Sequence, residues 1–410
     1  MATNCRFCGT ELEHVFADLG VSPLANSYIP AERFSAPQAF LPLRALVCSN
    51  CFLVQLEEYD ATPEELFSEY AYFSSYSTTW LEHARNYAHA MIDRFALGPQ
   101  STVVEVASND GYLLQYFAER GIDVLGVEPA ANVAAAAEAR GVETVVRFFG
   151  EEAARDLREE RAADLLVGNN VLAHVPDLND FVAGLRLLLK QGGVITLELP
   201  HLMRLIDGVQ FDTIYHEHFS YFSLSTVVRV LDAHGLRVFD VEELPTHGGS
   251  LRIYACHGGA AARPVDEHVD RLLEREEVAG YGRIDTYQEF AERVRREKRS
   301  ILSFFVDAKD AGATICAYGA PAKGNTLLNY CGLGADFIEY TVDRSPHKQG
   351  CYLPGTRLPI LEPSEIERTR PDFLFILPWN LKDEIMEQMR MIEGWGGRFI
   401  VRAPQLTVYP

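Results

Sequence analysis

The fold of this chain is decided by the stretch Val103-Val104-Glu105-Val106-Ala107-Ser108-Asn109-Asp110-Gly111-Tyr112. Its apolar beginning predicts the end of a buried strand, and Tyr112 opens a segment with the spacing of a helix. The small and polar residues between them let the backbone approach a ligand at the carboxyl end of the strand, where open α/β sheets bind ligands. The stretch therefore predicts a ligand site at the first strand of an α/β sheet.

The alternation of strand and helix continues on the C-terminal side of this stretch. This pattern predicts a doubly wound parallel sheet with an antiparallel finish at Leu236–Leu244 and Ser250–Ala255. The predicted strands of the parallel part are Thr102–Val106, Asp123–Val127, Asp164–Gly168 and Gly193–Glu198, and the predicted helices are Tyr112–Arg120, Ala130–Arg140 and Leu178–Leu189. On the N-terminal side, Thr62–Leu97 has helical spacing, with Pro63 at its start.

A second alternation follows a charged segment with helical periodicity, Pro264–Lys309. It predicts a smaller Rossmann-like unit, with the candidate strands Thr314–Tyr318, Phe337–Val342, Phe373–Ile376 and Arg398–Val401. The length of 410 residues is itself too great for one hydrophobic core and indicates two or three domains.

Charge and hydropathy exclude several classes of partner. The formal net charge is −21, whereas binding to nucleic-acid phosphates needs clustered lysine and arginine. The arginine-rich stretch Arg293–Arg299 is interleaved with glutamates, which is typical of a solvated helix face. No run of about 18 apolar residues predicts a transmembrane helix, and residues 1–11 lack the apolar core of a signal peptide. The expectation is a cytoplasmic enzyme with no nucleic-acid or membrane partner.

Two CxxC pairs lie near the N-terminus, Cys5-x2-Cys8 and Cys48-x2-Cys51. Four thiolates match a closed tetrahedral zinc site, which has no open position for a substrate, so the predicted role of the zinc is structural. The alternative is a set of reduced thiols or a redox dithiol, although redox CxxC motifs usually accompany a βαβ unit. The other four cysteines are expected to be ordinary thiols.

The loop after the first strand is a candidate cofactor site. Only Gly111 is a glycine there, so the GxGxxG phosphate cradle of dinucleotide-binding folds is absent. Glu128, before Pro129, closes the second strand and is placed to accept both hydroxyls of a ribose. This order of residues favours S-adenosylmethionine over a dinucleotide. The residues expected to bind it are Glu105, Ala107, Asn109, Asp110, Gly111, Tyr112, Glu128, Pro129, Asn169, Asn170 and Val171.

The segment Tyr215-His216-Glu217-His218-Phe219 is dense in ionisable groups. A histidine can abstract a proton near neutral pH, and a neighbouring carboxylate can orient or charge it. In a strand, His216 and His218 would share one face and Glu217 would take the other. A metal site and a polar loop with satisfied histidines are the alternatives, and the metal reading lacks a clear third ligand.

Four motifs in this order resemble the sugar C-methyltransferases that build branched deoxysugars of natural products, antibiotics among them. The motifs are the paired CxxC, Glu105-x4-Asp110-Gly111, Tyr215-x-Glu217-His218-Phe219 and Tyr318-Gly319-Ala320-x-Ala322-Lys323-x2-Thr326-Leu327. The resemblance covers essentially the whole chain. It implies a zinc-binding module (residues 1–65), a central class I Rossmann-like methyltransferase domain (66–258) and a helical connector with a C-terminal Rossmann-like domain that helps to hold a nucleotide sugar (259–410).

The resemblance also implies roles for single residues. The histidine matching His218 is the favoured base, with Glu217 and Tyr215 beside it. Tyr70, in the run Glu69–Ser75, and His174 match further active-site residues. The substrate implied is a TDP-linked 4-keto-6-deoxysugar, methylated at carbon 3, and its expected contacts are Tyr72, Ser75, Lys323 and Asn325. At position 216 a carboxylate can occur in the family, and His216 stands here, which leaves the choice of sugar open.

The residue types suit carbon methylation. A ketone acidifies the adjacent C–H bond, so a histidine can remove that proton, and a tyrosine can hydrogen-bond the enolate oxygen that results. The loop Gly319–Asn325 precedes a helical segment and could meet a diphosphate through its backbone N–H groups and Lys323. A tight turn with a solvated lysine is the alternative for this loop. For the whole chain, the alternatives are methylation at a sugar oxygen or nitrogen and a non-catalytic scaffold.

Overall fold

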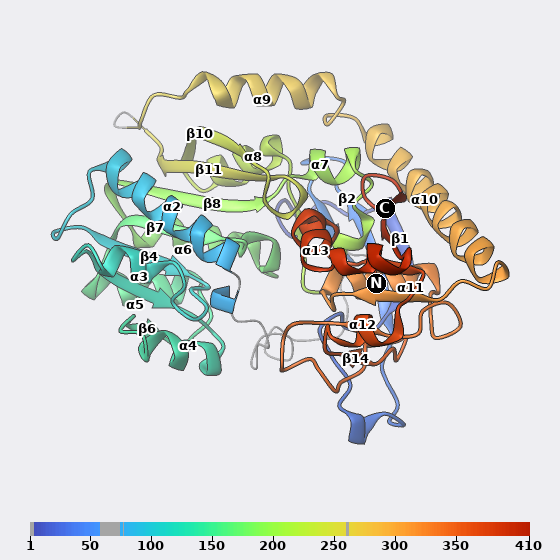
Figure 1. Ribbon diagram of the computed structural model, residues 1–410. Helices are drawn as coiled ribbons and strands as arrows, with labels where there is room; N and C mark the ends of the chain where they lie inside the picture. The colour runs from blue at the N-terminus through green and yellow to red at the C-terminus, as the bar shows by residue number, and fades with distance from the viewer. Residues whose placement is uncertain (1–3, 58–73, 77, 260–261) are drawn as a thin grey trace.

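The computed structural model describes residues 4–57, 74–76, 78–259 and 262–410. Three sheets organise them, and Figure 1 shows the central sheet in one lobe and the N-terminal and C-terminal sheets together in the other. Helix α9 (Glu267–Val278) lies along the outside between the lobes, and α10 (Ile284–Asp310) follows it. The helical periodicity of Pro264–Lys309 therefore corresponds to two helices. None of the helices in the described part of the chain has the length and apolar character needed to cross a bilayer.

The central sheet has seven strands in the order β10-β11-β8-β7-β4-β5-β6. Its β4 to β8 are parallel and its β10 and β11 antiparallel, as the sequence predicts. The bounds are β4 Thr102–Val106, β5 Asp123–Val127, β6 Thr144–Val145, β7 Ala163–Asn169, β8 Leu189–Pro200, β10 Leu236–Leu244 and β11 Ser250–His257.

Both faces of this sheet are covered by helices. Val103 and Leu165 point into a core with α2 and α3, whereas their neighbours Val104 and Leu166 point into a core with α5, α6 and α8. Strands covered on both faces are apolar at successive positions, which is why this part of the sequence reads as buried strand. The helices of this region are α2 Thr78–Phe95, α3 Leu114–Ala118, α4 Ala131–Glu138, α5 Glu151–Glu160, α6 Leu178–Leu188, α7 Leu202–Asp207 and α8 Leu224–Ala233.

The N-terminal sheet has the order β1-β2-β3-β9, and its last strand comes from the middle of the chain. Strand β9 (Ser220–Tyr221) pairs with β3 (Val54–Leu56) just after the segment that holds His218. The other two strands are β1 His14–Ser22 and β2 Leu41–Val47. The N-terminal module and the central domain are thus joined through backbone hydrogen bonds.

The C-terminal sheet has the order β14-β13-β12-β15-β16-β17, with β12 to β16 parallel. Its strands confirm the second alternation, although the expected strand Phe337–Val342 is reduced to two residues because Gly334–Ile338 forms hydrogen-bonded turns. The bounds are β12 Ile315–Tyr318, β13 Thr341–Val342, β14 Ile360–Leu361, β15 Phe373–Ile376, β16 Arg398–Val401 and β17 Thr407–Tyr409, with helices α11 Ala322–Cys331, α12 Glu365–Thr369 and α13 Lys382–Gln388.

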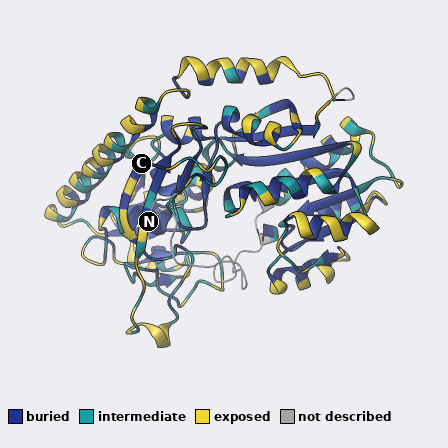
Figure 2. Ribbon diagram, turned by 180° about the vertical axis from the view of Figure 1, so that it is seen from behind, coloured by how far each residue is buried: buried dark blue, intermediate teal, exposed yellow. Residues whose placement is uncertain are grey.

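The zinc module and the C-terminal domain share one hydrophobic core. Phe16 of β1 stacks on Phe290 of α10, with the ring centroids 4.5 Å apart, and both side chains are fully buried. Figure 2 shows the inner side of α10 buried and its outer side exposed, as the charged periodicity of the sequence requires. The N-terminal module is therefore held by both larger domains.

A buried ion pair also joins the two larger domains. Asp212 follows α7 in the central domain, Arg402 follows β16, and both side chains are fully buried and in contact. Trp379 donates its indole N–H to the same carboxylate over 2.7 Å, and Arg402 donates to the carbonyl oxygen of Val209 over 2.9 Å. Breaking a buried pair is costly because a charge is left without compensation.

We expect Arg402→Met to reduce the free energy of unfolding by about 3–5 kcal/mol, because Asp212 would remain buried without its cation. Urea denaturation followed by fluorescence measures the change. The control is Arg204→Met, which breaks the exposed pair of Arg204 with Glu243 and should cost about 0–1 kcal/mol. Equal losses in the two variants would contradict the role assigned to Arg402.

Candidate functional site

The loop after β4 has an unusual backbone. Ala107, Asn109 and Gly111 have positive φ angles of 57°, 49° and 74°. At Gly111 a side chain would also meet Val142 at 3.1 Å, so this position needs glycine for both conformation and space. Non-glycine residues with positive φ cost free energy and cluster at ligand sites. The tight turns bring the backbone of residues 107–111 to the carboxyl ends of the central strands.

Two buried glutamates lie in this loop region. Glu128 accepts hydrogen bonds from the backbone N–H groups of Asn109, over 3.0 Å, and Ala130, over 2.9 Å. Each of its oxygens keeps a second lone pair, so the carboxylate can still accept ribose hydroxyls. Burial raises the pKa of Glu105 well above its ordinary value, and the charge of Glu128 adds to this effect. The site therefore combines acceptor oxygens with two carboxyl groups whose burial disfavours their charged forms.

Several oxygens at this edge of the sheet have no hydrogen-bond partner among the described residues. They are Glu105 Oε2, Asp110 Oδ1 and Asn169 Oδ1, all of them buried. Buried polar atoms are normally paired, so such a set indicates a missing polar ligand. S-adenosylmethionine fits it, because its ammonium group and ribose hydroxyls are donors and its sulfonium is a cation. A pyrophosphate offers mainly acceptor oxygens and would leave these oxygens without donors.

Ser75 lies against the cofactor loop. Its backbone N–H is 3.4 Å from Asp110 Oδ2, and its hydroxyl is 2.7 Å from Arg140 Nη2. Arg140 also pairs with Asp110 over 2.9 Å, and the N–H of Ser74 donates to Asn109 Oδ1 over 2.9 Å. The geometry thus brings Ser75, a sequence-predicted substrate residue, to the cofactor loop. Tyr70 and Tyr72 lie outside the described residues.

The end of β7 joins the cofactor loop to the histidines. Asn170 has a positive φ of 55° and donates its N–H to Glu198 O over 2.7 Å, which turns the chain away from the sheet. The carbonyl oxygen of Val171 then accepts a hydrogen bond from the backbone N–H of His174 over 2.8 Å. The ring of His174 packs edge-on against that of His218, with centroids 4.7 Å apart. His174 and His218 thus border the loop that follows Asn169, the last residue of β7.

His218 is buried and has a defined tautomer. Its Nδ1 lies 2.9 Å from the carbonyl oxygen of Thr213, which can only accept, so Nδ1 carries the proton. In the neutral ring Nε2 is then the basic nitrogen. Burial lowers the pKa of His218 well below its ordinary value, and the neighbouring His174 and Lys323 lower it further. The ring of Tyr215 lies 4.0 Å from it, centroid to centroid. At neutral pH the ring of His218 is therefore neutral, and its Nε2 can accept a proton.

The expected strand geometry of this segment is wrong. The N–H of His218 bonds to the carbonyl oxygen of Tyr215 over 2.9 Å, so the segment is a turn. His216 lies against the zinc module instead, 3.0 Å from the carbonyl oxygen of Pro42. The Thr213 carbonyl, and not the carboxylate of Glu217, orients the ring of His218. Glu217 itself is buried, which raises its pKa to about 7, while a hydrogen bond from Asn26 lowers it.

The loop before α11 faces this cluster from the C-terminal domain. Lys323 donates to Asn380 Oδ1 over 2.7 Å and lies 4.7 Å above the ring of Trp379. Burial lowers its pKa to about 8, so it remains largely protonated at neutral pH. Asn325, the other predicted substrate contact, donates instead to the carbonyl oxygen of Ala25 over 2.6 Å, and its buried Oδ1 has no partner among the described residues.

Sequence reasoning missed residues that lie between the two parts of the site. Trp80 of α2 packs against His247, with centroids 5.2 Å apart, and against Tyr112 at 6.1 Å. Burial lowers the pKa of His247 to about 4, and the charge of Lys323 contributes. His247 has a positive φ of 54°, which the tripeptide His247-Gly248-Gly249 could have suggested. Nothing in the sequence singled out Trp80.

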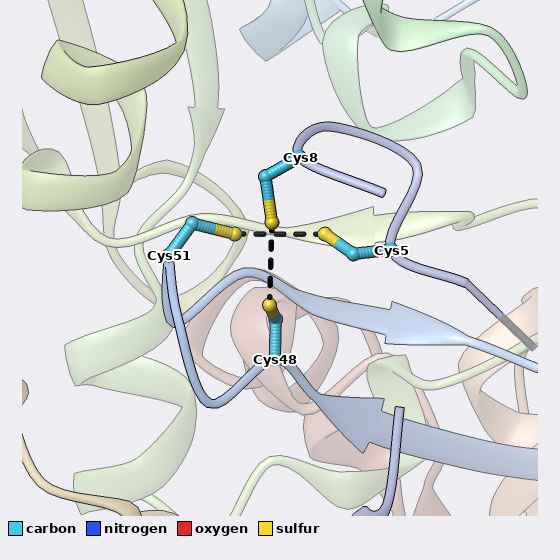
Figure 3. Close-up of side chains that lie close together, drawn as sticks. All are labelled: Cys5, Cys8, Cys48 and Cys51. Carbon is cyan, nitrogen blue, oxygen red and sulfur yellow. Dashed lines mark hydrogen bonds between the residues drawn. The ribbon is translucent and has the colours of Figure 1, made fainter. Parts of the chain in front are cut away.

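The four cysteines of the paired CxxC motifs come together. Figure 3 shows their sulfurs pointing toward one another from two turns, and all four lie within 4.8 Å of each other. Cys5 and Cys51 are 3.5 Å apart, as are Cys8 and Cys48, close to the value of about 3.8 Å for a tetrahedral zinc–thiolate site. Gln55 donates to the sulfur of Cys5 over 3.2 Å, as an outer partner of a metal ligand does. The residues fit a structural zinc ion.

Comparison with known families agrees with this architecture. Residues 5–67 match a zinc-binding domain, residues 80–241 a methyltransferase domain, and residues 245–404 the C-methyltransferase C-terminal domain. The chain is 36% identical to C-methyltransferase NovU of Streptomyces niveus over 408 residues, which is 98% of this chain and 96% of that protein.

Two solved structures overlap the central part of the chain. One is 1,6-didemethyltoxoflavin-N1-methyltransferase of Burkholderia thailandensis, with a TM-score of 0.38, 20% identity, and coverage of 50% of this chain and 95% of that one. The other is an S-adenosylmethionine-dependent methyltransferase of Clostridium acetobutylicum, with a TM-score of 0.35, 11% identity, and coverage of 44% and 92%. The identity to NovU along the whole chain, together with the three family matches, shows that this protein belongs to the C-methyltransferase family, as an S-adenosylmethionine-dependent enzyme with a structural zinc site.

Proposed function

We propose that this enzyme methylates carbon 3 of a nucleoside-diphosphate 4-keto-6-deoxysugar, in the biosynthesis of a branched deoxysugar. The observation that carries the proposal is the buried, neutral ring of His218. The carbonyl oxygen of Thr213 orients this ring, and the rings of His174 and Tyr215 pack against it. Carbon methylation beside a ketone needs such a base, because the acceptor carbon must first lose a proton. The motif resemblance described above supplies the sugar and its TDP group.

The base in this proposal is His218 Nε2, which removes the proton from carbon 3. Its Nδ1–H bond to Thr213 holds the ring and stabilises the imidazolium that forms. The ketone oxygen becomes an enolate oxygen, and Tyr215 is the proposed donor to it, with Tyr70 as a second candidate. Glu217 adjoins His218 in the chain, and its ionised form would favour the charged ring electrostatically. The electron pair at carbon 3 would then form the new C–C bond to the methyl group of bound S-adenosylmethionine, while the carbon–sulfur bond breaks and S-adenosylhomocysteine leaves.

Cofactor binding is assigned to the loop after β4 and its neighbours. In this proposal the carboxylate of Glu128 accepts hydrogen bonds from the ribose hydroxyls of S-adenosylmethionine. Asp110 Oδ1 and Asn169 Oδ1 accept hydrogen bonds from the ammonium group of its methionine part, since these buried oxygens lack partners among the described residues. Bound S-adenosylmethionine supplies an electrophilic methyl group on its sulfonium. Holding donor and acceptor together makes the transfer effectively unimolecular.

The nucleotide of the sugar is assigned to the C-terminal domain. Lys323 is a buried cation at the start of α11, and its charge acts on His218 and His247, so it lies near the base. A diphosphate would gain from this cation and from the N–H groups at the start of the helix. This assignment keeps the division into residues 1–65, 66–258 and 259–410, with the sugar bound between the last two.

The test is mass spectrometry of nucleotide sugars incubated with the enzyme and S-adenosylmethionine. A gain of one methyl on a TDP-4-keto-6-deoxysugar, located at carbon 3 by NMR, is the expected result. In deuterated water, the enzyme should also exchange the proton at carbon 3. Methylation at oxygen or nitrogen without exchange would overturn the carbon chemistry. Tight binding of S-adenosylmethionine with no turnover on any ketosugar would indicate a scaffold.

A further inference from the structure

The segment that follows β1 is held by the C-terminal domain. Asn325 donates to the carbonyl oxygen of Ala25 over 2.6 Å, and the hydroxyl of Tyr28 donates to the carbonyl oxygen of Ala320 over 2.6 Å. Ile29 exchanges two backbone hydrogen bonds with Tyr352, of 2.9 and 2.8 Å. Residues 25–29 therefore belong to the zinc module in sequence but are fixed by the loops that flank the candidate nucleotide site.

One side chain of this segment reaches the candidate active site. The amide nitrogen of Asn26 donates to both carboxylate oxygens of Glu217, over 2.8 and 3.0 Å. A carboxylate can only accept, so the NH₂ group and not the oxygen of Asn26 must face it. Glu217 is only 5% exposed, so this contact supplies donors that water would otherwise provide.

We propose that Asn26 is a positioning residue that fixes the carboxylate of Glu217, the residue before His218 in the chain, during methyl transfer. The zinc module then contributes a side chain to the active site, in addition to its role in stability. This inference rests on the proposed function in one respect, namely that Glu217 supports the base.

The charge balance around Glu217 explains why a neutral amide is suited to this position. Burial raises the pKa of Glu217 to about 7, and the N–H donors of Asn26 lower it by stabilising the ionised form. Other titratable groups interact with Glu217 or lie close to it in the chain. Tyr28 from the zinc module and His174, which bonds the backbone of Glu217, interact with it, and Tyr215, His216 and His218 lie within two residues of it in the chain. Without Asn26 the carboxyl would protonate at higher pH.

The experiment compares the pH dependence of kcat in Asn26→Ala with that of the unmodified enzyme. If the ionised carboxylate supports the base, the acidic limb should move to higher pH by about one unit, because one pKa unit is a tenfold change in ionisation. At pH 7 kcat should then fall about fivefold, because the ionised fraction of Glu217, whose pKa is about 7, falls from about one half to about one eleventh, while the affinity for S-adenosylmethionine is unchanged. Asn26→Ser, which keeps a hydroxyl donor, should recover part of the shift.

The matched control is Asn179→Ala. Asn179 of α6 also ties the zinc module to the central domain, donating to the carbonyl oxygens of Arg6 and Phe7 over 3.1 and 2.9 Å, and neither bond involves Glu217. The pH dependence of kcat in Asn179→Ala should equal that of the unmodified enzyme. Zinc content and melting temperature, measured for both variants, show whether each one is folded.

Glu217→Gln separates this inference from the proposed function. If Glu217→Gln lowers kcat and a folded Asn26→Ala keeps the original pH profile, the positioning role is refuted and the function stands. If Glu217→Gln is as active as the unmodified enzyme, the role proposed for the carboxylate itself is wrong. A shift in Asn26→Ala equal to that in Asn179→Ala would also overturn the inference, because loosened docking of the module would then explain both.

Discussion

Replacing His218 with glutamine should lower kcat for methyl transfer by about 10²–10⁴-fold, the usual contribution of a general base. Glutamine has a similar reach but no basic nitrogen, so the proton at carbon 3 would lose its acceptor. The affinity for S-adenosylmethionine should not change, because the cofactor loop after β4 does not involve this side chain. Single-turnover methylation measures the first quantity, and calorimetric titration measures the second.

His216→Gln is the control for this variant. His216 lies two residues away but contacts the carbonyl oxygen of Pro42 in the zinc module, and glutamine can keep that hydrogen bond. We expect kcat within a few-fold of the unmodified enzyme. Exchange of the proton at carbon 3 with deuterated solvent should disappear in His218→Gln and persist in His216→Gln. Persistent exchange in His218→Gln would transfer the base role to another residue, with Glu217 as the first candidate.

Cys48→Ser should have the largest effect on stability. Structural zinc contributes about 10–16 kcal/mol of apparent binding free energy in small zinc peptides, and loss of one thiolate removes much of this contribution. The module packs against α10 and pairs with β9, so its loss would expose part of the core shared with the C-terminal domain. We expect less than one zinc ion per chain by atomic emission and a large fall in melting temperature.

Cys351→Ser is the matched control for the zinc site. Cys351 is a partly buried free thiol in the C-terminal domain, outside the four-cysteine cluster. Its replacement should leave both zinc content and melting temperature unchanged. If Cys48→Ser kept a full zinc ion and its stability, the four cysteines would not be the ligands of a structural site.

The sequence predicted the central sheet well, because its strands are buried on both faces and its helices are amphipathic. Strands β5, β10, β15 and β16 begin and end at the residues expected, and the paired CxxC motifs indicated the zinc cluster. These features depend on local patterns of two to four residues. The length of β13 was overestimated, since the turns around Gly334 compete with the apolar run before Thr341.

The site was predictable in its residue types and less so in its contacts. The chemistry of Glu128 and His218 was visible in the sequence, whereas the partners of Glu217 were not. Asn26 lies 191 residues from Glu217, and an isolated asparagine in a loop carries no signal. The strand-like alternation of His216 and His218 was misleading, because the turn that reverses the chain there contains no glycine or proline.

Strand β9 has a consequence for the order in which the chain folds during synthesis. The edge of β3 stays open until Ser220 and Tyr221 have left the ribosome, although the rest of the N-terminal sheet is made first. At about 5–20 residues per second, this interval lasts about 10–30 s. An open edge is a template for wrong pairing with other chains. The first module to be translated is therefore among the last to be closed, and it is complete only when the segment before β9, which holds His218, has reached its place.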